Sequence, residues 1–342
     1  MQQSTDVLVI GGSAAGIVAA TTAKSFHPEK SVTLVRKEPE VLVPCGIPYI
    51  FGTLESSDKD VIPDTVLSGA GVELKIDEIT AINPEQKTCT CADNTEIAFD
   101  KLILATGSTP VKPKWLKGGD LENVFTIPKN KSYLDGIRGK LRTDHQKIAV
   151  VGGGFIGVEL ADELAKTGKE VTIIEMLPYI LNAAFDSEVA EKAQKTVEAR
   201  GIAVQSGSGV KEILGNGKVS GVALNNGASL EADAVVLSMG YAPNSTLAKN
   251  SGLPVNDMGF IKVNEYMHTQ NPDIFAVGDC AEKTSFITRT CKPTMLASTA
   301  CAEARIAGIN LYRITTLRSF GGTVSIFCTA LDDTAFGAAG VT

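Results

Sequence analysis

Short apolar runs that end in glycine turns recur along the chain. Residues 6–10 and 148–151 form two such runs, and each leads through glycines into a helix-like segment of small and apolar residues. A short apolar run bounded by turn signals is typical of a buried strand, and the succession of strand, turn and helix is typical of α/β folds. Three further runs, at residues 99–108, 234–244 and 271–282, also end in glycine turns. The pattern therefore predicts an α/β fold.

Composition narrows the possible partners and the location. The 342 residues carry a net charge of −7 and no run of Lys or Arg, so nothing indicates binding to nucleic acid or to an anionic membrane. Neither a signal peptide nor an apolar stretch long enough to cross a bilayer is visible in the sequence. The length predicts two or three domains. We expect a cytoplasmic protein.

The cysteines and histidines give no metal pattern. The seven cysteines are odd in number and show no C-x-x-C pair, which argues against a zinc site and a secreted disulfide framework. Cys89 and Cys91 lie in an alternating segment that predicts a hairpin strand, with metal binding as an open alternative. His27, His145 and His268 lie outside the glycine turns, and we interpret them as surface or loop residues. We expect no bound metal.

The first glycine turn predicts a dinucleotide cradle of the Rossmann type. Gly11 permits the tight turn and Gly16 lets the helix lie close to the strand, while the middle glycine position is Ser13. The free N–H groups at the start of the helix suit a diphosphate. The next strand ends at Arg36, where such folds normally carry an acid for the adenosine ribose. Arg36 cannot accept those hydrogen bonds, so either Glu38 or a contact elsewhere is left to do so.

The second glycine turn follows the dinucleotide pattern in full. Gly152, Gly154 and Gly157 have the G-x-G-x-x-G spacing after the strand at residues 148–151, and Glu175 closes the next strand. An acid at that place accepts from both ribose hydroxyls and repels a 2′-phosphate. This turn therefore predicts NADH rather than NADPH.

Five motifs in a fixed order resemble the FAD/NAD-linked pyridine nucleotide–disulfide oxidoreductases. They are GGSAAG, ATG, GGGFIGVE, GYAPN and AVGDCA, and the resemblance runs from about Asp6 to the last residue. It implies a first fold that holds FAD and a second, inserted fold that holds NADH. It also implies that Asp279 binds the ribityl chain of the flavin and that Glu159 lies near the contact of flavin and nicotinamide. The loop at residues 292–297 would bring a helix N-terminus to the flavin ring.

The resemblance implies the remaining cofactor contacts residue by residue. For FAD these are Gly11, Gly12, Ser13, Ala14, Gly16, Glu38, Pro44, Ala105, Thr106, Gly107, Gly278, Asp279, Leu296 and Ala297. For NADH they are Gly152, Gly154, Phe155, Ile156, Gly157, Glu175 and Gly240.

Cys45 identifies the branch of the family that the chain resembles. It lies where the family brings redox thiols to the flavin, but Ile50 stands where two-cysteine members have their second cysteine. A single cysteine followed by G-[hydrophobic]-P-Y resembles the coenzyme A–disulfide reductases and their NADH oxidase and persulfide reductase relatives. We expect Gly46 to leave room for the flavin ring and Pro48 to lie in the first turn of a helix, whose positive end near Cys45 would lower the pKa of that thiol.

The sequence leaves the electron acceptor open. We expect an NADH-dependent flavoprotein that reduces a disulfide, persulfide or polysulfide through Cys45, with Glu159 as the second catalytic residue. Ala14 replaces the histidine that peroxide-using relatives carry, and Lys24 is the only base of the first helix, which leaves coenzyme A weakly supported. The alternatives are an NADH oxidase that uses dioxygen and a reductase that passes electrons to rubredoxin or ferredoxin.

The resemblance also predicts the domain organisation. Residues 1–111 and 245–318 would form the FAD domain, and residues 112–244 would form the NAD domain. Residues 319–342 resemble the start of a dimerisation domain that then breaks off, so we expect a truncated chain whose full form is a homodimer.

Overall fold

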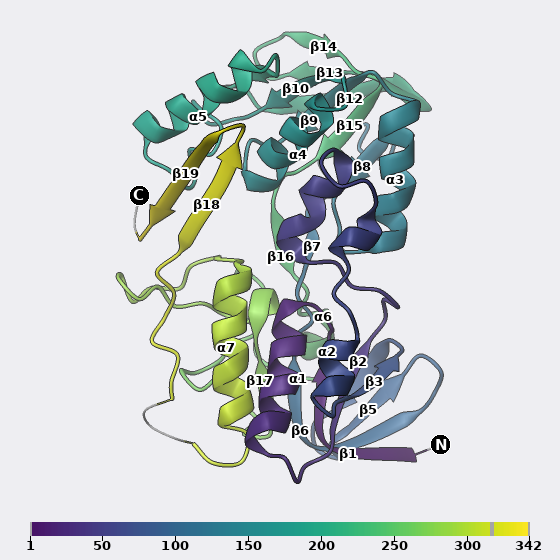
Figure 1. The fold of residues 1–342 in the computed structure, drawn as a ribbon, viewed down its shortest axis with the longest axis vertical. Helices are drawn as coiled ribbons and strands as arrows, with labels where there is room; N and C mark the ends of the chain where they lie inside the picture. Colours follow the sequence, from purple (N-terminus) through teal and green to yellow (C-terminus); the bar gives the residue numbers. More distant parts are fainter. Residues whose placement is uncertain (1, 315–317, 341–342) are drawn as a thin grey trace. The chain divides into compact units, whose positions relative to one another are not determined.

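The computed structural model describes residues 2–314 and 318–340, which form two compact units (Figure 1). The first unit comprises Met1–Pro44, Val61–Thr109 and Ala242–Ser325. The second comprises Cys45–Asp60, Pro110–Tyr241 and Ile326–Thr342. The strands β7 (Ser108–Pro110) and β16 (Tyr241–Pro243) lie at two of the points where the chain leaves one unit for the other.

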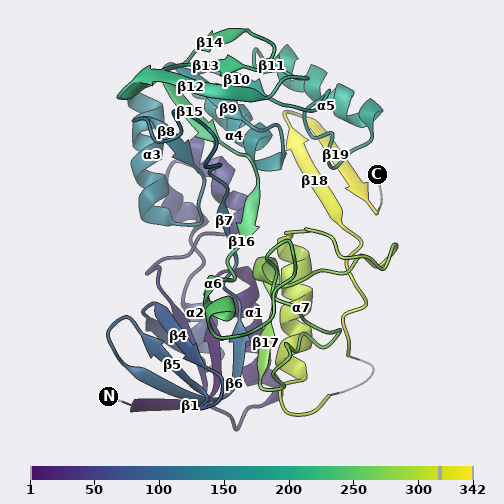
Figure 2. The same ribbon diagram turned by 180° about the vertical axis from the view of Figure 1, so that it is seen from behind.

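A mixed sheet forms the centre of the first unit. Its strands run in the order β3-β2-β1-β6-β5-β4. Strand β17 also pairs with β6, and the two lie side by side in Figure 2. Strands β1, β2, β3, β6 and β17 are parallel, whereas β4 and β5 form an antiparallel arm. The strands are β1 (Gln2–Ile10), β2 (Val32–Arg36), β3 (Glu73–Ile76), β4 (Ile79–Asn83), β5 (Thr88–Cys91), β6 (Glu96–Leu104) and β17 (Ile274–Ala276). The helices are α1 (Ala14–Phe26), α2 (Thr65–Gly69), α6 (Thr246–Asn250), α7 (Ala297–Ile309) and the 3-10 turn η3 (Gly278–Cys280).

Both faces of this sheet are buried. Successive residues of its central strand point to opposite faces, so they belong to different hydrophobic clusters. Val7 and Val9 of β1 belong to one hydrophobic cluster, and Leu8 and Ile10 belong to another. Helices α1 and α7 cover the first of these faces with small side chains, mostly alanine, that allow close approach. A Cβ built on Gly308 of α7 would lie 2.9 Å from the Cβ of Thr22, so this pair of helices has no room for a larger side chain there.

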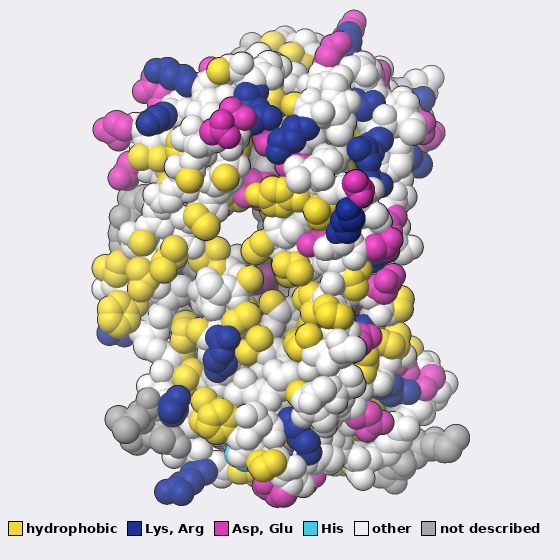
Figure 3. Space-filling view, in the orientation of Figure 1, with side chains coloured by type: hydrophobic (Ala, Val, Ile, Leu, Met, Phe, Trp, Pro, Cys, Tyr) yellow, Lys and Arg dark blue, Asp and Glu magenta, His cyan; other side chains and the backbone are white. Residues whose placement is uncertain are grey.

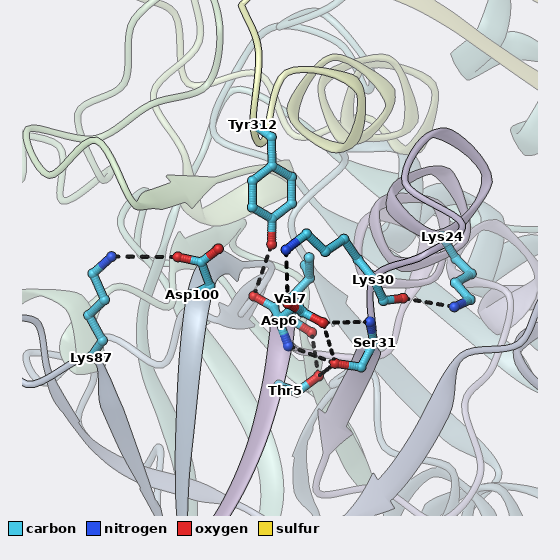
Figure 4. A network of polar contacts seen from close by, with 9 residues as sticks. All are labelled: Thr5, Asp6, Val7, Lys24, Lys30, Ser31, Lys87, Asp100 and Tyr312. Atoms are coloured by element: carbon cyan, nitrogen blue, oxygen red, sulfur yellow. Dashed lines mark hydrogen bonds and ion pairs between the residues drawn. The ribbon is translucent and has the colours of Figure 1, made fainter.

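A polar network fixes the middle of β1 against the loop before β2 (Figure 4). The carboxylate of Asp6 accepts from the backbone N–H and the hydroxyl of Ser31, both at 2.8 Å, and pairs with Lys30 at 3.0 Å. These hydrogen bonds lower the pKa of Asp6 to about 2. The hydroxyl of Tyr312 donates to the backbone carbonyl of Asp6, which ties the segment after α7 to the same point.

A five-stranded parallel sheet forms the centre of the second unit, in the order β11-β10-β9-β15-β8. A separate antiparallel sheet, β12-β13-β14, packs in the same hydrophobic cluster as β9 and β15. The strands are β8 (Val124–Thr126), β9 (Lys147–Val151), β10 (Glu170–Ile174), β11 (Ala203–Gln205), β12 (Val210–Asn216), β13 (Lys218–Leu224), β14 (Ser229–Glu231) and β15 (Ala234–Leu237). The helices are α3 (Lys131–Thr143), α4 (Phe155–Ala165), α5 (Ser187–Ala199) and the 3-10 turns η1 (Pro44–Phe51) and η2 (Ser57–Asp60).

The last described residues form a hairpin of β18 (Ile326–Leu331) and β19 (Thr334–Ala339) that packs on α4. Phe155 of α4 stacks on Phe327 of β18 with ring centroids 5.5 Å apart. Glu159, one turn further along α4, accepts from Thr329, two residues further along β18. The i, i+4 spacing of the helix therefore matches the i, i+2 spacing of the strand.

The predicted α/β class with two Rossmann-like sheets is confirmed. Cys89 and Cys91 lie on β5 as expected, and Cys91 shares a corner with Asp77 and Asp93. Lys75 pairs with both of these carboxylates, so a lysine ammonium already occupies that corner. Among the described helices, none is long and apolar enough to cross a membrane. Lysine, arginine, aspartate and glutamate side chains are interspersed on the face drawn in Figure 3.

His145 lies in the loop between α3 and β9, in agreement with its interpretation as a surface or loop residue, and its side chain is buried there. One detail differs from the predictions. Pro48 does not lie in the first turn of a helix; it lies further along η1, whose first residue is Pro44. The run of 3-10 turns started one residue before Cys45, which the proline spacing alone could not show.

Candidate functional site

The first glycine turn has the backbone of a diphosphate cradle. Gly11 has a φ of 109°, which favours glycine, and a Cβ built there would lie 2.2 Å from the carbonyl oxygen of Ala105. A Cβ on Gly16 would lie 1.8 Å from the carbonyl oxygen of Gly11, so α1 can approach the turn only because residue 16 is glycine. Ser13 precedes α1 without a side-chain capping bond. The N–H groups that begin α1 are thus left for an anionic ligand.

Three of the predicted FAD segments meet at this edge of the sheet. The glycine turn, the turn at Ala105–Gly107 and the turn at Gly278–Asp279 follow β1, β6 and β17, which are neighbouring parallel strands. A Cβ on Gly278 would lie 2.8 Å from the Cβ of Ala15, which shows how closely the third turn approaches α1. Ligands of open α/β sheets bind at the carboxyl ends of parallel strands. These turns therefore fit the diphosphate and ribityl parts of FAD.

Asp279 and the start of α7 complete this group. The hydroxyl of Ser108 donates to the carboxylate of Asp279 at 2.7 Å, and the hydroxyl of Thr106 donates to the carbonyl of Asn244 at 2.6 Å. Helix α7 begins at Ala297 as predicted, with Leu296 before it and no side-chain cap.

The end of β2 carries a cation rather than an acid. The side chain of Arg36 is buried beneath Gly12, where a Cβ would lie 2.4 Å from its Cδ. Its Nε donates to the carbonyl of Glu38 at 2.9 Å, and its Nη2 donates to the carbonyl of Pro39 at 2.7 Å and pairs with Asp64 at 2.8 Å. Arg36 thus holds the loop after β2, and the role of Glu38 toward a ribose stays a prediction.

The second glycine turn repeats this geometry with an acid in place. Gly152 has a φ of 112°, and a Cβ on Gly157 would lie 2.0 Å from the carbonyl oxygen of Gly152. The carboxylate of Glu175 accepts from the N–H of Gly153 and from that of Leu177, both at 2.7 Å. A Cβ on Gly154 would meet nothing within 4 Å. The protein's own packing therefore does not require glycine at 154, and the open space beside it suits the close approach of a dinucleotide.

The other predicted NADH residues lie around the same turn. Phe155 and Ile156 begin α4, and the ring of Phe155 lies between those of Phe185 and Phe327, at 5.7 and 5.5 Å. Gly240, with a φ of 90°, follows β15, whose neighbour in the sheet is the strand that leads into the turn, β9.

Cys45 lies in the second unit, in the first turn of η1. It is an exposed residue. Arg138 of α3 anchors the segment that carries it, because its Nε donates to the carbonyl of Ile50 at 2.6 Å. Its neighbour Gly46 faces Asp60: a Cβ on Gly46 would lie 1.7 Å from the Oδ1 of that carboxylate. Within this structure a side chain at position 46 would force the carboxylate of Asp60 to move, a constraint separate from the room for a flavin that we expected.

The pKa of Cys45 is raised, not lowered as expected from a helix N-terminus. The protein atoms around the thiol contribute most, the charge of Glu159 comes next and Cys328 adds to the shift, while Lys129 opposes it. A short 3-10 turn with proline at its centre offers little of the dipole that an α-helix would supply.

Glu159 lies close enough to Cys45 to act on its charge. Its carboxylate accepts from the hydroxyl of Thr329 at 2.8 Å. Burial raises the pKa of Glu159, and the bond from Thr329 opposes that rise. Sequence reasoning missed two residues that act on this site: Thr329, which acts on the pKa of Glu159, and Lys129, which acts on the pKa of Cys45. A hydroxyl on β18, 170 positions from Glu159, carried no local signal, and Lys129 stands in no motif.

Comparison with known proteins agrees with this geometry. A family model described as pyridine nucleotide-disulphide oxidoreductase matches residues 5–304. The chain belongs to this family. Its members are NAD(P)H-dependent flavoenzymes, and the predicted enzyme class is confirmed at that level.

The names of individual relatives differ in the electron acceptor. An NADH oxidase of Methanocaldococcus jannaschii is 33% identical over 317 residues, which cover 89% of this chain and 69% of the relative. An NAD(P)H coenzyme A polysulfide/persulfide reductase of Pyrococcus horikoshii is 30% identical over 316 residues, with the same coverage of 89% and 69%. The solved structure of an NAD-dependent persulfide reductase from A. fulgidus superposes with a TM-score of 0.92 at 29% identity, and this chain spans 64% of its length.

Proposed function

We propose that the protein is an NADH-dependent flavoprotein that reduces a disulfide, persulfide or polysulfide through Cys45. The observation that carries the proposal is that Cys45 is an exposed residue within electrostatic reach of the carboxylate of Glu159, in the same unit as the glycine turn with the ribose-type acid Glu175. The relatives named as persulfide reductases support a sulfur acceptor.

Cys45 would act as the nucleophile toward sulfur. Its thiolate attacks one sulfur of a substrate RSSR, the S–S bond breaks, RS⁻ leaves and a mixed disulfide forms on Cys45. FAD, when bound, would take a hydride from NADH and supply the electron pair that reduces this mixed disulfide. The overall balance is NADH + H⁺ + RSSR → NAD⁺ + 2 RSH.

The raised pKa of Cys45 sets a requirement for this chemistry. At neutral pH the group rests as the thiol, so a proton has to leave before it attacks. Glu159 is a carboxylate with a raised pKa, held by Thr329, and it would receive or relay that proton. Lys129, which lowers the pKa of Cys45, would stabilise the thiolate once it has formed.

Reoxidation of the reduced flavoprotein tests the role of Cys45. FAD-loaded protein is reduced with one equivalent of NADH without oxygen, and coenzyme A disulfide or inorganic polysulfide is then added. We expect rapid return of oxidised-flavin absorbance in the wild type and loss of that step in Cys45→Ser, with reduction by NADH intact. Cys291→Ser, which alters a partly exposed cysteine of the first unit, is the matched control and is expected to behave as the wild type. Equal reoxidation in Cys45→Ser would sink the proposal.

An NADH oxidase is the second candidate. The raised pKa of Cys45 favours it, because a thiol is a poor nucleophile, and relatives with that name reach 33% identity. Wild-type protein that reoxidises with dioxygen but with neither sulfur compound would establish this alternative.

The division of the chain between the cofactors is part of the proposal. Residues 1–111 and 245–318 would bind FAD, and residues 112–244 would bind NADH.

A cytoplasmic location is also part of the proposal. The seven cysteines of the chain are all free thiols in the structure, which suits a reducing cytoplasm.

A further inference from the structure

A buried ion pair lies directly behind the Gly278–Asp279 turn. The ammonium of Lys283 and the carboxylate of Glu303 are 3.0 Å apart, and both side chains are fully buried. Glu303 comes from the middle of α7, whereas Lys283 follows the turn itself. Removing two charged groups from water is costly, and further hydrogen bonds to the pair offset part of that cost. These hydrogen bonds show which backbone groups the pair holds in place.

The pair binds both polar groups of one residue. Oε2 of Glu303 accepts from the N–H of Gly278 at 2.9 Å, and Nζ of Lys283 donates to the carbonyl of Gly278 and to that of Ala281. Gly278 has a φ of 76°, a conformation in which a glycine is favoured. The hydrogen bonds from the ion pair therefore fix the backbone of Gly278 and, through it, the orientation of the next residue, Asp279.

One oxygen of the pair has no partner. Oε1 of Glu303 is buried and accepts no hydrogen bond among the described residues. The charged groups that act on Glu303 are Lys283 and Asp279, while β17 is apolar and the first turn of α1 carries no acid. Burial raises the pKa of Glu303 to about 7, Lys283 and the Gly278 N–H oppose the rise, and Asp279 adds to it.

We propose that Lys283 and Glu303 are positioning residues for FAD, and that a proton on Oε1 of Glu303 controls the net charge behind the Gly278–Asp279 turn. With Glu303 ionised, its charge cancels that of Lys283. With Glu303 protonated, the charge of Lys283 is left to face the anionic diphosphate of the cofactor. The inference rests on the proposed function, since it requires FAD in the first unit.

The sign of the pH dependence follows from linkage. An anionic ligand near Glu303 raises the pKa of that carboxyl further, so FAD binding takes up a proton. Affinity for FAD is therefore highest below pH 7, where Glu303 is already protonated in the free protein. It falls as the pH rises through about 7.

The experiment measures FAD affinity of flavin-stripped protein between pH 5.5 and 8.5, by quenching of flavin fluorescence. We expect the wild-type dissociation constant to rise about tenfold across this range, which is the effect of one unit of pKa linkage. In Glu303→Gln, which keeps the shape and lacks the charge, we expect an affinity that does not depend on pH and equals that of the wild type at low pH.

Two further variants separate charge from folding. Lys283→Met/Glu303→Leu replaces the pair by apolar side chains, and we expect pH-independent but weaker binding because the positive charge is gone. Glu163→Gln alters a buried carboxylate of the second unit whose partner, Lys166, is partly exposed, and should keep the wild-type profile. If Glu303→Gln does not fold, the double variant supplies the same comparison.

The outcomes distinguish this inference from the proposed function. Wild-type protein that binds FAD equally at every pH, or variants that keep the wild-type profile, would overturn the inference and leave the flavoprotein assignment intact. Wild-type protein that binds no FAD at any pH would overturn both.

Discussion

Glu175 offers the sharpest test of coenzyme choice, and Glu175→Gln is the change that isolates its charge. Both carboxylate oxygens accept main-chain N–H groups at 2.7 Å, one from Gly153 and one from Leu177. An amide has one oxygen, so one of these N–H groups loses its acceptor. The remaining oxygen is also a weaker acceptor for the ribose hydroxyls of NADH.

The size of the effect follows from these bonds. A hydrogen bond to a charged group contributes about 1.5–3 kcal/mol, roughly twice as much as a neutral one. We therefore expect kcat/KM for NADH to fall by roughly 10- to 100-fold, with about 1.4 kcal/mol for each factor of ten. NADPH gains instead, because its 2′-phosphate no longer meets a carboxylate, so the NADH/NADPH ratio should fall by more than the NADH value alone.

The assay is anaerobic flavin reduction by NADH and by NADPH over a range of concentrations. Thermal unfolding measured beside it registers any loss of stability at the turn, and the ratio of the two coenzymes cancels that loss because both bind the same fold. Glu170→Gln, the same substitution at the exposed start of β10, is the control and should leave the ratio unchanged. An NADH kcat/KM within threefold of wild type, with an unchanged ratio, would refute the assignment of Glu175.

Three further predictions concern the two sites. Gly154→Ala, whose Cβ meets nothing within 4 Å, should unfold at the wild-type temperature and raise the dissociation constant for NADH at least tenfold, whereas a folding defect would contradict the open approach. Glu159→Gln removes the charge that raises the pKa of Cys45, so the pH profile of alkylation of Cys45 by iodoacetamide should move to lower pH; an unmoved profile would contradict that coupling. Gly46→Ala places a Cβ 1.7 Å from Oδ1 of Asp60 and should destabilise the protein by about 1–3 kcal/mol in thermal unfolding, and added Asp60→Ala should restore part of it.

The parts of the fold that depend on local pattern could be read from the sequence. Alternation in the first apolar run places Val7 and Leu8 on opposite, equally buried faces, as a central parallel strand requires. The glycine spacings located both turns because close backbone approach excludes any side chain at Gly16 and Gly157. Such constraints act within about twenty residues, and a sequence pattern records them directly.

The surroundings of Cys45 could not be read in the same way. The carboxylate of Glu159, which acts on the pKa of Cys45, and the hydroxyl of Thr329, which donates to Glu159, both come from distant segments. A proline three residues after a cysteine predicts a helical turn, but it does not say which charges the fold will bring beside the thiol. The reactivity of Cys45 is thus a tertiary property, and the motif around it has only local content.

The two glycine turns also show what a local sequence pattern leaves open. Their backbones are alike, but the charged side chain that contacts each turn has the opposite sign. At Gly153 the carboxylate of Glu175 both binds the turn and accepts; at Gly12 the guanidinium of Arg36 fills the corresponding place and can only donate. Its donors go to the carbonyls of Glu38 and Pro39, so the cation shapes the loop after β2. The end of β2 therefore supplies no acceptor for a ribose in the first unit, which keeps the carboxylate of Glu38 as the residue to test.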